Sequence, residues 1–103
     1  MIKLDNYARE EEMRGDRRFY RWKVFVDEDQ SILDQIEEVD YQLNPTFPQP
    51  EQTVRNPQDG FSLETAGWGE FTLSADIKFR DGRVETVAYW LDLGKEWPDD
   101  KDQ

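Results

Sequence analysis

Apolar and polar residues alternate along much of the chain, which is the pattern of β-strands with one buried face. The longest such run extends from Phe71 to Arg80, and its apolar side chains are Phe71, Leu73, Ala75, Ile77 and Phe79. Asp81-Gly82 follows directly and favours a tight turn, because glycine adopts left-handed conformations at little cost. We therefore predict a hairpin in which a strand from Val84 to Leu93 returns antiparallel to the first.

Shorter runs predict further strands. Tyr20 to Val26 alternates with Tyr20, Trp22, Val24 and Val26 on one face, and Val39 to Leu43 alternates up to a proline-rich stretch at 45–50 that interrupts the pattern. Residues 52–55 are interpreted as a short edge strand, 56–60 as a turn and 61–64 as the start of another strand. Residues 32–38 are interpreted as one helical turn or a short connection.

The pattern therefore predicts an all-β fold, an immunoglobulin-like antiparallel β-sandwich of about seven to eight strands, with barrel closure as an open alternative. A length of 103 residues suits one domain with one modest core. We place that domain at residues 1–95. Residues 96–103 are charged, contain Pro98 and lack alternation, so we expect a frayed C-terminal tail.

Composition excludes several classes of function. The chain has no cysteine and no histidine, so disulfides, thiolate metal sites and the usual catalytic bases are absent. We expect no cofactor, no metal and no enzymatic activity. Asp27-Glu28-Asp29 leaves calcium binding as a minor alternative to a solvated turn, because it lacks the glycine-containing loop that calcium sites use.

The formal net charge of −11 disfavours binding to nucleic acids or anionic membranes and favours a basic partner, although it also serves solubility alone. No segment has the length and hydrophobicity of a membrane span or of a signal peptide. We expect a monomer in the cytoplasm, or in the nucleus of a eukaryote. Four arginines at 14, 17, 18 and 21 follow three glutamates at 10–12, and we expect them to pair with these glutamates or with solvent rather than to bind an acidic partner.

Two aromatic loops interrupt the strand pattern, at Leu43 to Pro48 and at Glu64 to Phe71. In the second loop Trp68 stands between Gly67 and Gly69, which allows a sharp turn and a close approach of the backbone to a ligand. Trp68 is therefore a candidate binding wall. The alternative is a loop tryptophan that folds back to cap the core.

Three strings in this order resemble the YEATS domain, and the resemblance spans roughly residues 15–93. They are Trp22-Lys23-Val24-Phe25-Val26, Leu43-Asn44-Pro45-Thr46-Phe47-Pro48 and Glu64-Thr65-Ala66-Gly67-Trp68-Gly69-Glu70-Phe71. The chain is similar to the compact YEATS-like domains of prokaryotes. The resemblance implies a non-catalytic reader of acetyl- or crotonyl-lysine on a peptide or a basic protein.

The resemblance also implies a role for each matching residue. Thr46 supplies a hydroxyl to the acyl amide, and Phe47 and Trp68 form the two aromatic walls around it. The Trp68 backbone N–H donates to the acyl carbonyl, and Gly67 and Gly69 let that backbone reach the ligand.

Phe71 lies at the base of the channel or in the core beneath it. At Asn44 the family's well-known readers carry histidine, and asparagine can form a similar hydrogen bond but cannot stack as a ring does. The competing hypothesis is an adaptor that keeps the sandwich and recruits a protein through another surface.

Overall fold

The computed structural model of the chain describes residues 2–98. Within this range the chain is mainly β-structure, with one helical turn at Gln30–Leu33 (α1) and a 3-10 turn at Pro57–Asp59 (η1). The strands are β1 Leu4–Arg14, β2 Arg17–Val26, β3 Ile36–Gln42, β4 Glu51–Val54, β5 Leu63–Gly67, β6 Thr72–Phe79 and β7 Val84–Trp90. No helix among the described residues has the length and apolar content that crossing a membrane requires.

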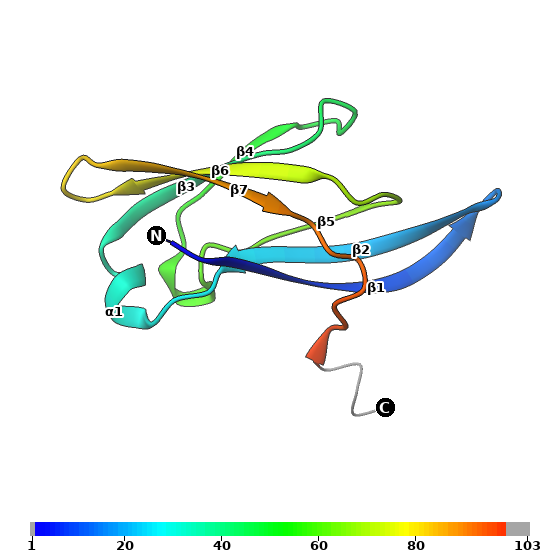
Figure 1. The fold of residues 1–103 in the computed structure, drawn as a ribbon, viewed down its shortest axis with the longest axis horizontal. Coiled ribbons are helices and arrows are strands. Elements are labelled where there is room, and N and C mark those ends of the chain that lie inside the picture. Colours follow the sequence, from blue (N-terminus) through cyan, green and yellow to red (C-terminus); the bar gives the residue numbers. More distant parts are fainter. Residues whose placement is uncertain (1, 99–103) are drawn as a thin grey trace.

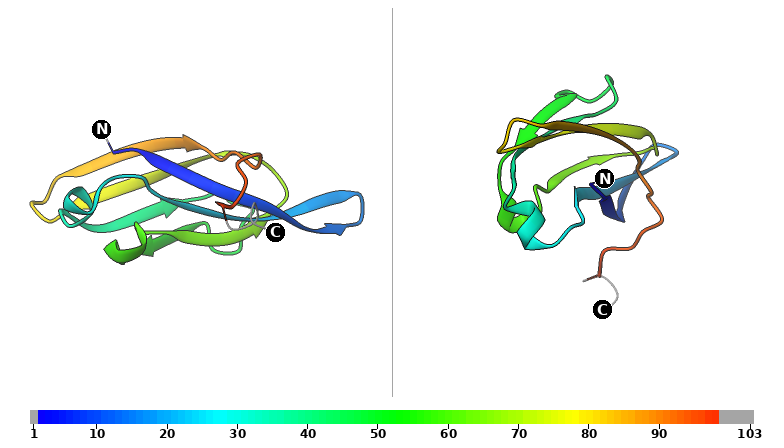
Figure 2. Two further views of the ribbon diagram at one scale, coloured as in Figure 1. Left: turned by 90° about the horizontal axis from the view of Figure 1, so that it is seen from below. Right: turned by 60° about the vertical axis from the view of Figure 1, so that its left-hand side comes forward.

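The strands form two antiparallel sheets that pack face to face (Figures 1 and 2). One sheet has the order β1-β2-β5, and the other has the order β4-β3-β6-β7. The predicted immunoglobulin-like sandwich is confirmed, and the seven strands of the described range lie within the predicted number. The predicted hairpin is also confirmed, since β6 and β7 pair antiparallel across the turn that contains Gly82.

The core lies between the inner faces of the two sheets, as the alternation predicts. Trp22, Val24 and Val26 of β2 are buried, and so are Leu73, Ala75, Ile77 and Phe79 of β6. Each strand therefore contributes every second residue to one shared apolar layer. Phe71 was predicted to start the β6 run, but it precedes that strand and is only half-buried, which leaves part of its ring available to a surface pocket.

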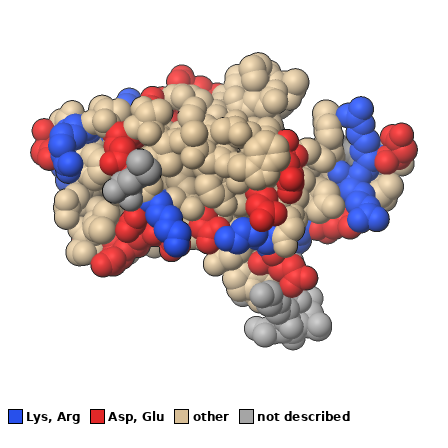
Figure 3. All heavy atoms as spheres, viewed as in Figure 1, with Lys and Arg blue, Asp and Glu red and all other residues tan. Residues whose placement is uncertain are grey.

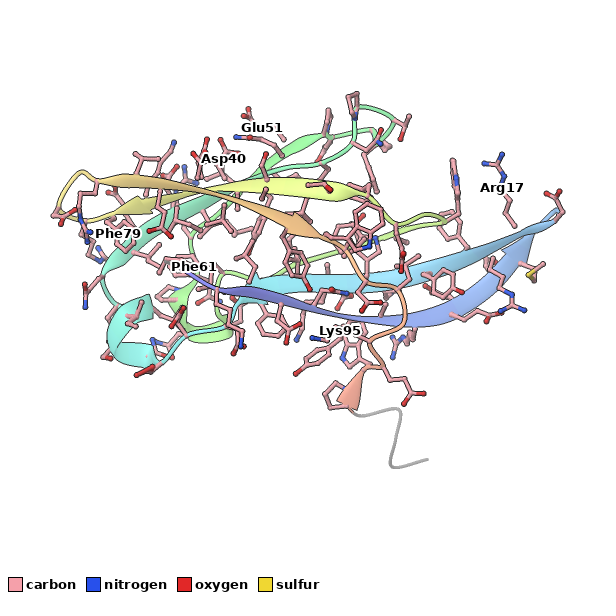
Figure 4. All side chains as sticks on the ribbon, in the orientation of Figure 1. Arg17, Asp40, Glu51, Phe61, Phe79 and Lys95 are labelled. Atoms are coloured by element: carbon pink, nitrogen blue, oxygen red, sulfur yellow. The ribbon has the colours of Figure 1, made fainter. Side chains whose placement is uncertain are left out.

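One buried contact fixes the backbone between η1 and β5. Phe61 has a φ of 55°, a left-handed conformation that is costly for an aromatic residue, and it is fully buried. The hydroxyl of Tyr41 donates to the Phe61 carbonyl over 2.8 Å, and burial raises the pKa of Tyr41 far above its ordinary value. The core thus holds this turn, where Figure 4 labels Phe61, in place. β5 begins at Leu63 rather than at Phe61.

β1 is a strand that the sequence pattern did not reveal. Its first half alternates into the core, but Asn6 is a polar residue at a buried position, and beyond Ala8 both faces of the strand are exposed. The reason is visible in Figure 1: the β1–β2 hairpin projects past the end of the sandwich. On this hairpin Arg18 pairs with Glu10 and Arg21 with Glu11, as predicted for these two arginines, whereas Arg17 lies over the ring of Trp68.

β3 starts earlier than predicted. It begins at Ile36 instead of Val39. A bulge between Ile36 and Glu38 inserts one extra residue and shifts the alternation of buried positions. Ile36 and Val39 therefore both face the core although they are three positions apart, which hides the strand from a period-two search. The helical turn that precedes it, α1, lies a little earlier than the predicted 32–38.

The C-terminal segment packs along β1. The Ala8 backbone N–H donates to the Lys95 carbonyl over 2.7 Å, and Ala8 and Glu96 form a parallel bridge. The Lys95 ammonium pairs with the Asp5 carboxylate, and the Trp97 ring lies under the guanidinium of Arg9 at 5.0 Å. Of the predicted tail at 96–103, residues 99–103 lie outside the described residues.

Asn6 joins the two sheets beside this segment. It is fully buried, and its side-chain oxygen accepts from the Tyr89 hydroxyl and from the Asp92 N–H. Its amide nitrogen donates to the Asp92 carbonyl over 2.9 Å. Burial, together with the nearby Asp5 and Asp92 charges, raises the pKa of Tyr89 to about 12, so this hydroxyl remains a donor at neutral pH. The polar residue that obscured β1 in the sequence is therefore a structural link to β7.

Candidate functional site

The loops after β3 and β5 meet at one end of the sandwich and enclose a pocket of about 370 Å³. All seven residues predicted to form a binding site line this pocket: Asn44, Thr46, Phe47, Gly67, Trp68, Gly69 and Phe71. Phe47 of the first loop and Trp68 of the second lie 21 positions apart in the chain and are brought together by the sandwich. A smaller hollow of about 170 Å³ shares Phe47 and Pro48 with this pocket and is otherwise lined by Gln49, Gln52 and Thr65.

Asn44 organises the first loop. Its side-chain oxygen accepts two hydrogen bonds, from the backbone N–H and from the hydroxyl of Thr46, both at 3.0 Å. The Asn44 carbonyl accepts from the Phe47 N–H, also at 3.0 Å. Asparagine stabilises turns by this type of local hydrogen bond. Because the Thr46 proton points toward Asn44, the lone pairs of that hydroxyl are left to accept a hydrogen bond from a ligand.

Phe47 and Phe71 form one side of the pocket, which we call the core wall. Their ring centroids are 5.4 Å apart, and both rings contact the buried Trp22, at 6.2 Å from Phe47 and 6.0 Å from Phe71. Trp22 has no exposed surface. Tilted and edge-on aromatic contacts of this kind add to the burial of the rings. The core wall is therefore continuous with the hydrophobic core.

Trp68 and Phe19 form the other side, which we call the hairpin wall. Their ring centroids are 6.3 Å apart, and the guanidinium of Arg17 lies 5.1 Å from the Trp68 ring centroid. Trp68 keeps 54% of its surface exposed, so it does not fold back to cap the core. Arg17 and Phe19 belong to the projecting part of β2, where Figure 4 labels Arg17. This wall is held by the hairpin and not by the core.

The two glycines beside Trp68 have different surroundings. A Cβ added at Gly67 would lie 3.3 Å from Cζ of Phe47, which is closer than most side chains tolerate. A Cβ added at Gly69 would meet nothing within 4 Å. Neither has a positive φ. Glycine at 67 is therefore needed for the approach of Phe47. No protein atom excludes a side chain at 69, and the expectation that Gly69 lets the backbone reach a ligand stays a prediction.

Four further residues line the pocket but were not among the predicted site residues: Phe19, Pro48, Ala66 and Glu70. Phe19 is recognisable only from strand register, since Tyr20 pairs with Gly67 and the ring of the preceding Phe19 contacts that of Trp68. Glu70 is the only carboxylic acid among the lining residues within the described chain, and it accepts from the Leu93 N–H over 2.9 Å. Its place in the Gly-Trp-Gly-Glu-Phe string was the signal that could have identified it.

The outer face of the β4-β3-β6-β7 sheet carries a separate group of acids (Figure 4). Burial, followed by the charge of Glu51, raises the pKa of Asp40, and Oδ1 of Asp40 has no hydrogen-bond partner. Hydrogen bonds from Thr86 first and Gln42 second lower the pKa of Asp76, which lies opposite Asp40 in the register. Among residues 2–98 no group of three or more acidic side chains is arranged to hold a metal ion.

Comparison with known protein families identifies the chain. Residues 20–92, more than half of its length, match the model of the prokaryotic YEATS domain. The chain belongs to this family. The resemblance seen in three sequence strings is therefore confirmed. The match to the YEATS domain begins within β2 and ends just after β7, so that β1 lies outside it.

A curated relative of this YEATS domain is transcription initiation factor TFIID subunit 14 of Schizosaccharomyces pombe. The two are 39% identical over 61 residues, which cover 59% of this chain and 20% of the relative. The YEATS domain described here thus matches about a fifth of the length of that protein.

Solved structures of the yeast protein Yaf9 share the fold. The Yaf9 YEATS domain recognizing an H3K122suc peptide has a TM-score of 0.71 at 23% identity, over 91% of this chain and 78% of that chain. The Yaf9 YEATS domain bound to H3K27ac has a TM-score of 0.67 at 22% identity, over 90% of this chain and 76% of that chain. At these identities the likeness shows a common fold.

Proposed function

We propose that this YEATS domain is a non-catalytic binding module for acylated lysine, acetyl or crotonyl, held between the core wall and the hairpin wall. The observation that carries the proposal is the pocket itself, because an exposed Trp68 and a half-buried Phe47 line one space together with the Thr46 hydroxyl. The Yaf9 YEATS domain, which shares the fold, has been solved with an acylated histone peptide. YEATS domains are binding modules, and this pocket suits that role.

The chemistry of an acylated lysine fits these groups. Its amide is flat and neutral, so it stacks between aromatic rings and needs one donor and one acceptor. The ligand N–H donates to Thr46 Oγ1, whose own proton is directed to Asn44. The backbone N–H of Trp68 donates to the acyl carbonyl. Asn44 thus takes over the positioning of the hydroxyl that the family's readers assign to histidine.

Unmodified lysine is discriminated against by desolvation. Its ammonium group would lose water on entering a slot lined mainly by aromatic rings, glycine and proline, and burial of an unpaired charge is far costlier than burial of a hydrogen-bonded amide. The one lining carboxylate, Glu70, already accepts from the Leu93 N–H. The net charge of −11 favours, through long-range attraction, a partner whose sequence around the acylated lysine is basic.

A titration with a matched control tests the proposal. Acetyl- and crotonyl-lysine peptides are added while backbone amide shifts are followed, and we expect the shifts to centre on residues 44–47 and 67–71. Trp68→Ala should weaken binding at least tenfold, because one wall of the slot is removed. Trp90→Ala removes a tryptophan of nearly the same exposure, 55% against 54% for Trp68, outside the pocket and should leave binding unchanged. No response at millimolar peptide, or equal effects of the two variants, would contradict the proposal.

The adaptor hypothesis makes a different structural demand. The adaptor hypothesis would be supported by a Trp68 ring that folds into the core and leaves no pocket. The Trp68 ring is instead exposed and lines an open pocket, which favours the acyl-lysine-binding module. If the folded protein bound no acylated peptide, the result would support the adaptor hypothesis.

A further inference from the structure

The indole nitrogen of Trp22 is a buried donor without a partner. The side chain has no exposed surface, and within residues 2–98 Nε1 has no hydrogen-bond partner. Buried donors are almost always paired, and leaving one unpaired destabilises the folded state. A phenylalanine would supply an aromatic ring here without burying a donor. The unpaired N–H therefore requires an explanation.

This N–H lies directly behind the pocket. A Cβ added at Gly67 would be 3.9 Å from Nε1, and Gly67 lines the pocket. The two rings that contact Trp22, those of Phe47 and Phe71, line it as well. The donor therefore lies close behind Gly67 and Phe47, two residues that line the space a ligand would fill.

Phe47 has room to move aside. The ring is only half-buried. The smaller hollow is also lined by Phe47, and Thr65, which pairs with Trp22 across the strands, lines that hollow too. A small shift of the ring toward this hollow would uncover the indole N–H from the pocket side.

We propose that Trp22 Nε1–H donates a hydrogen bond to a neutral acceptor on the acyl chain, so that this domain prefers hydroxylated short acyl groups on lysine over the plain acyl group of equal length. The inference rests on the proposed function, because it needs the acyl amide to be held at Thr46 and Trp68. A hydroxyl fits better than a carboxylate, since an anion would lose its hydration among aromatic rings and would lie in the same pocket as Glu70.

The test compares two peptides that differ by one oxygen atom, carrying butyryl-lysine or 3-hydroxybutyryl-lysine. A hydrogen bond to a donor that is otherwise unpaired should strengthen binding of the hydroxylated peptide about fivefold to tenfold. Trp22→Phe keeps an aromatic ring and removes the donor, so it should bring the ratio of the two affinities to about one, even where its affinity for both peptides falls because Trp22 supports Phe47 and Phe71. Trp90→Phe, at an exposed tryptophan outside the pocket, should retain the preference.

A second measurement uses the unaltered protein, in case Trp22→Phe does not fold. The indole N–H signals of the four tryptophans are followed by NMR during both titrations. The Trp22 signal should move strongly downfield with the hydroxylated peptide alone. Equal affinities with an unmoved Trp22 signal overturn this inference and leave the reader function intact. Failure of both peptides to bind overturns the reader function and the inference together.

Discussion

The core wall and the hairpin wall enclose the same pocket but depend on different parts of the molecule. Phe47 and Phe71 rest on Trp22, which is completely buried between the sheets. Trp68 rests on Phe19 and Arg17, which extend beyond the sandwich on a charged hairpin (Figure 3). A change to the first wall therefore alters folding and binding together, whereas a change to the second alters binding alone.

The largest expected effect is on stability, and it follows from removing the buried residue that supports the core wall. Trp22→Ala should lower the free energy of unfolding by about 3–5 kcal/mol, because it leaves a large cavity beneath Phe47 and Phe71. Trp68→Ala should lower it by less than about 0.5 kcal/mol, since that ring is largely exposed. Urea denaturation of both variants measures the difference. Similar losses in the two would show that the walls are not independent.

Gly67→Ala tests how tightly the two walls are coupled. The new Cβ would lie 3.3 Å from Cζ of Phe47, so Phe47 must shift, and we expect about a tenfold loss of peptide affinity with a destabilisation of about 1 kcal/mol. Gly69→Ala is the control, because its Cβ meets no atom within 4 Å. Isothermal titration and thermal melting of both variants provide the measurement. If Gly69→Ala is as damaging as Gly67→Ala, steric contact is not the cause.

A smaller effect is expected at the hairpin. Arg17→Gln removes the guanidinium from the Trp68 ring, and loss of a cation–π contact at an exposed site corresponds to about 0.5–1 kcal/mol. Peptide affinity should fall about twofold to fivefold, because Trp68 is held less firmly, and the melting temperature should fall by at most about 5 °C. Arg18→Gln removes the same charge from the neighbouring position, where the arginine pairs with Glu10. An equal fall in both variants would assign the effect to net charge instead of to the ring.

The smallest effect concerns a surface outside both walls. Asp40 has a raised pKa, so its charge destabilises the folded state at neutral pH, and that cost disappears as the pH falls below about 3.9, where both states are protonated. Asp40→Asn should therefore stabilise the protein at pH 7 by less than about 1 kcal/mol, and the gain should vanish in acid.

Asp76→Asn should have the opposite sign. The pKa of Asp76 is lowered, so its charge contributes stability above about pH 3.9, and this contribution is lost as the pH falls through the folded-state pKa. Denaturation of both variants between pH 3 and pH 7 measures the signs. Peptide affinity should be unchanged in both, because neither residue lines the pocket. If both substitutions changed the free energy of unfolding in the same direction, the opposite pKa shifts of Asp40 and Asp76 would be contradicted.

The sequence predicted those parts of the fold in which one face is buried throughout. β6 was recognised because its alternation is uninterrupted, and β3 was recognised only from Val39 because the bulge shifts its phase. β1 was missed because its outer half has two exposed faces and its inner half includes the polar Asn6. Period-two patterns report burial on one face, so they fail where a strand leaves the core or changes phase.

The pocket residues on the loops could be named from sequence, while their supports could not. Gly67, Trp68 and Thr46 stand in recognisable strings, but the contact of Phe19 with Trp68 depends on the register between β2 and β5. The role of Asn44 was also open, because two acceptor bonds from Thr46 are a matter of loop conformation. Cross-strand neighbours and local turns both require three-dimensional coordinates.

The hydrogen bond from Ala8 to Lys95 has a consequence for self-association. An uncovered edge strand offers its main-chain groups to another chain, and here residues 95 and 96 occupy part of the free edge of β1. The family match at 20–92 includes neither β1 nor this cover, yet Ile2, Leu4 and Ala8 belong to the core. The folding unit is thus larger than the stretch that defines the family. A fragment limited to residues 20–92 would expose an unpaired strand edge, and we expect it to exchange strands between molecules or to aggregate.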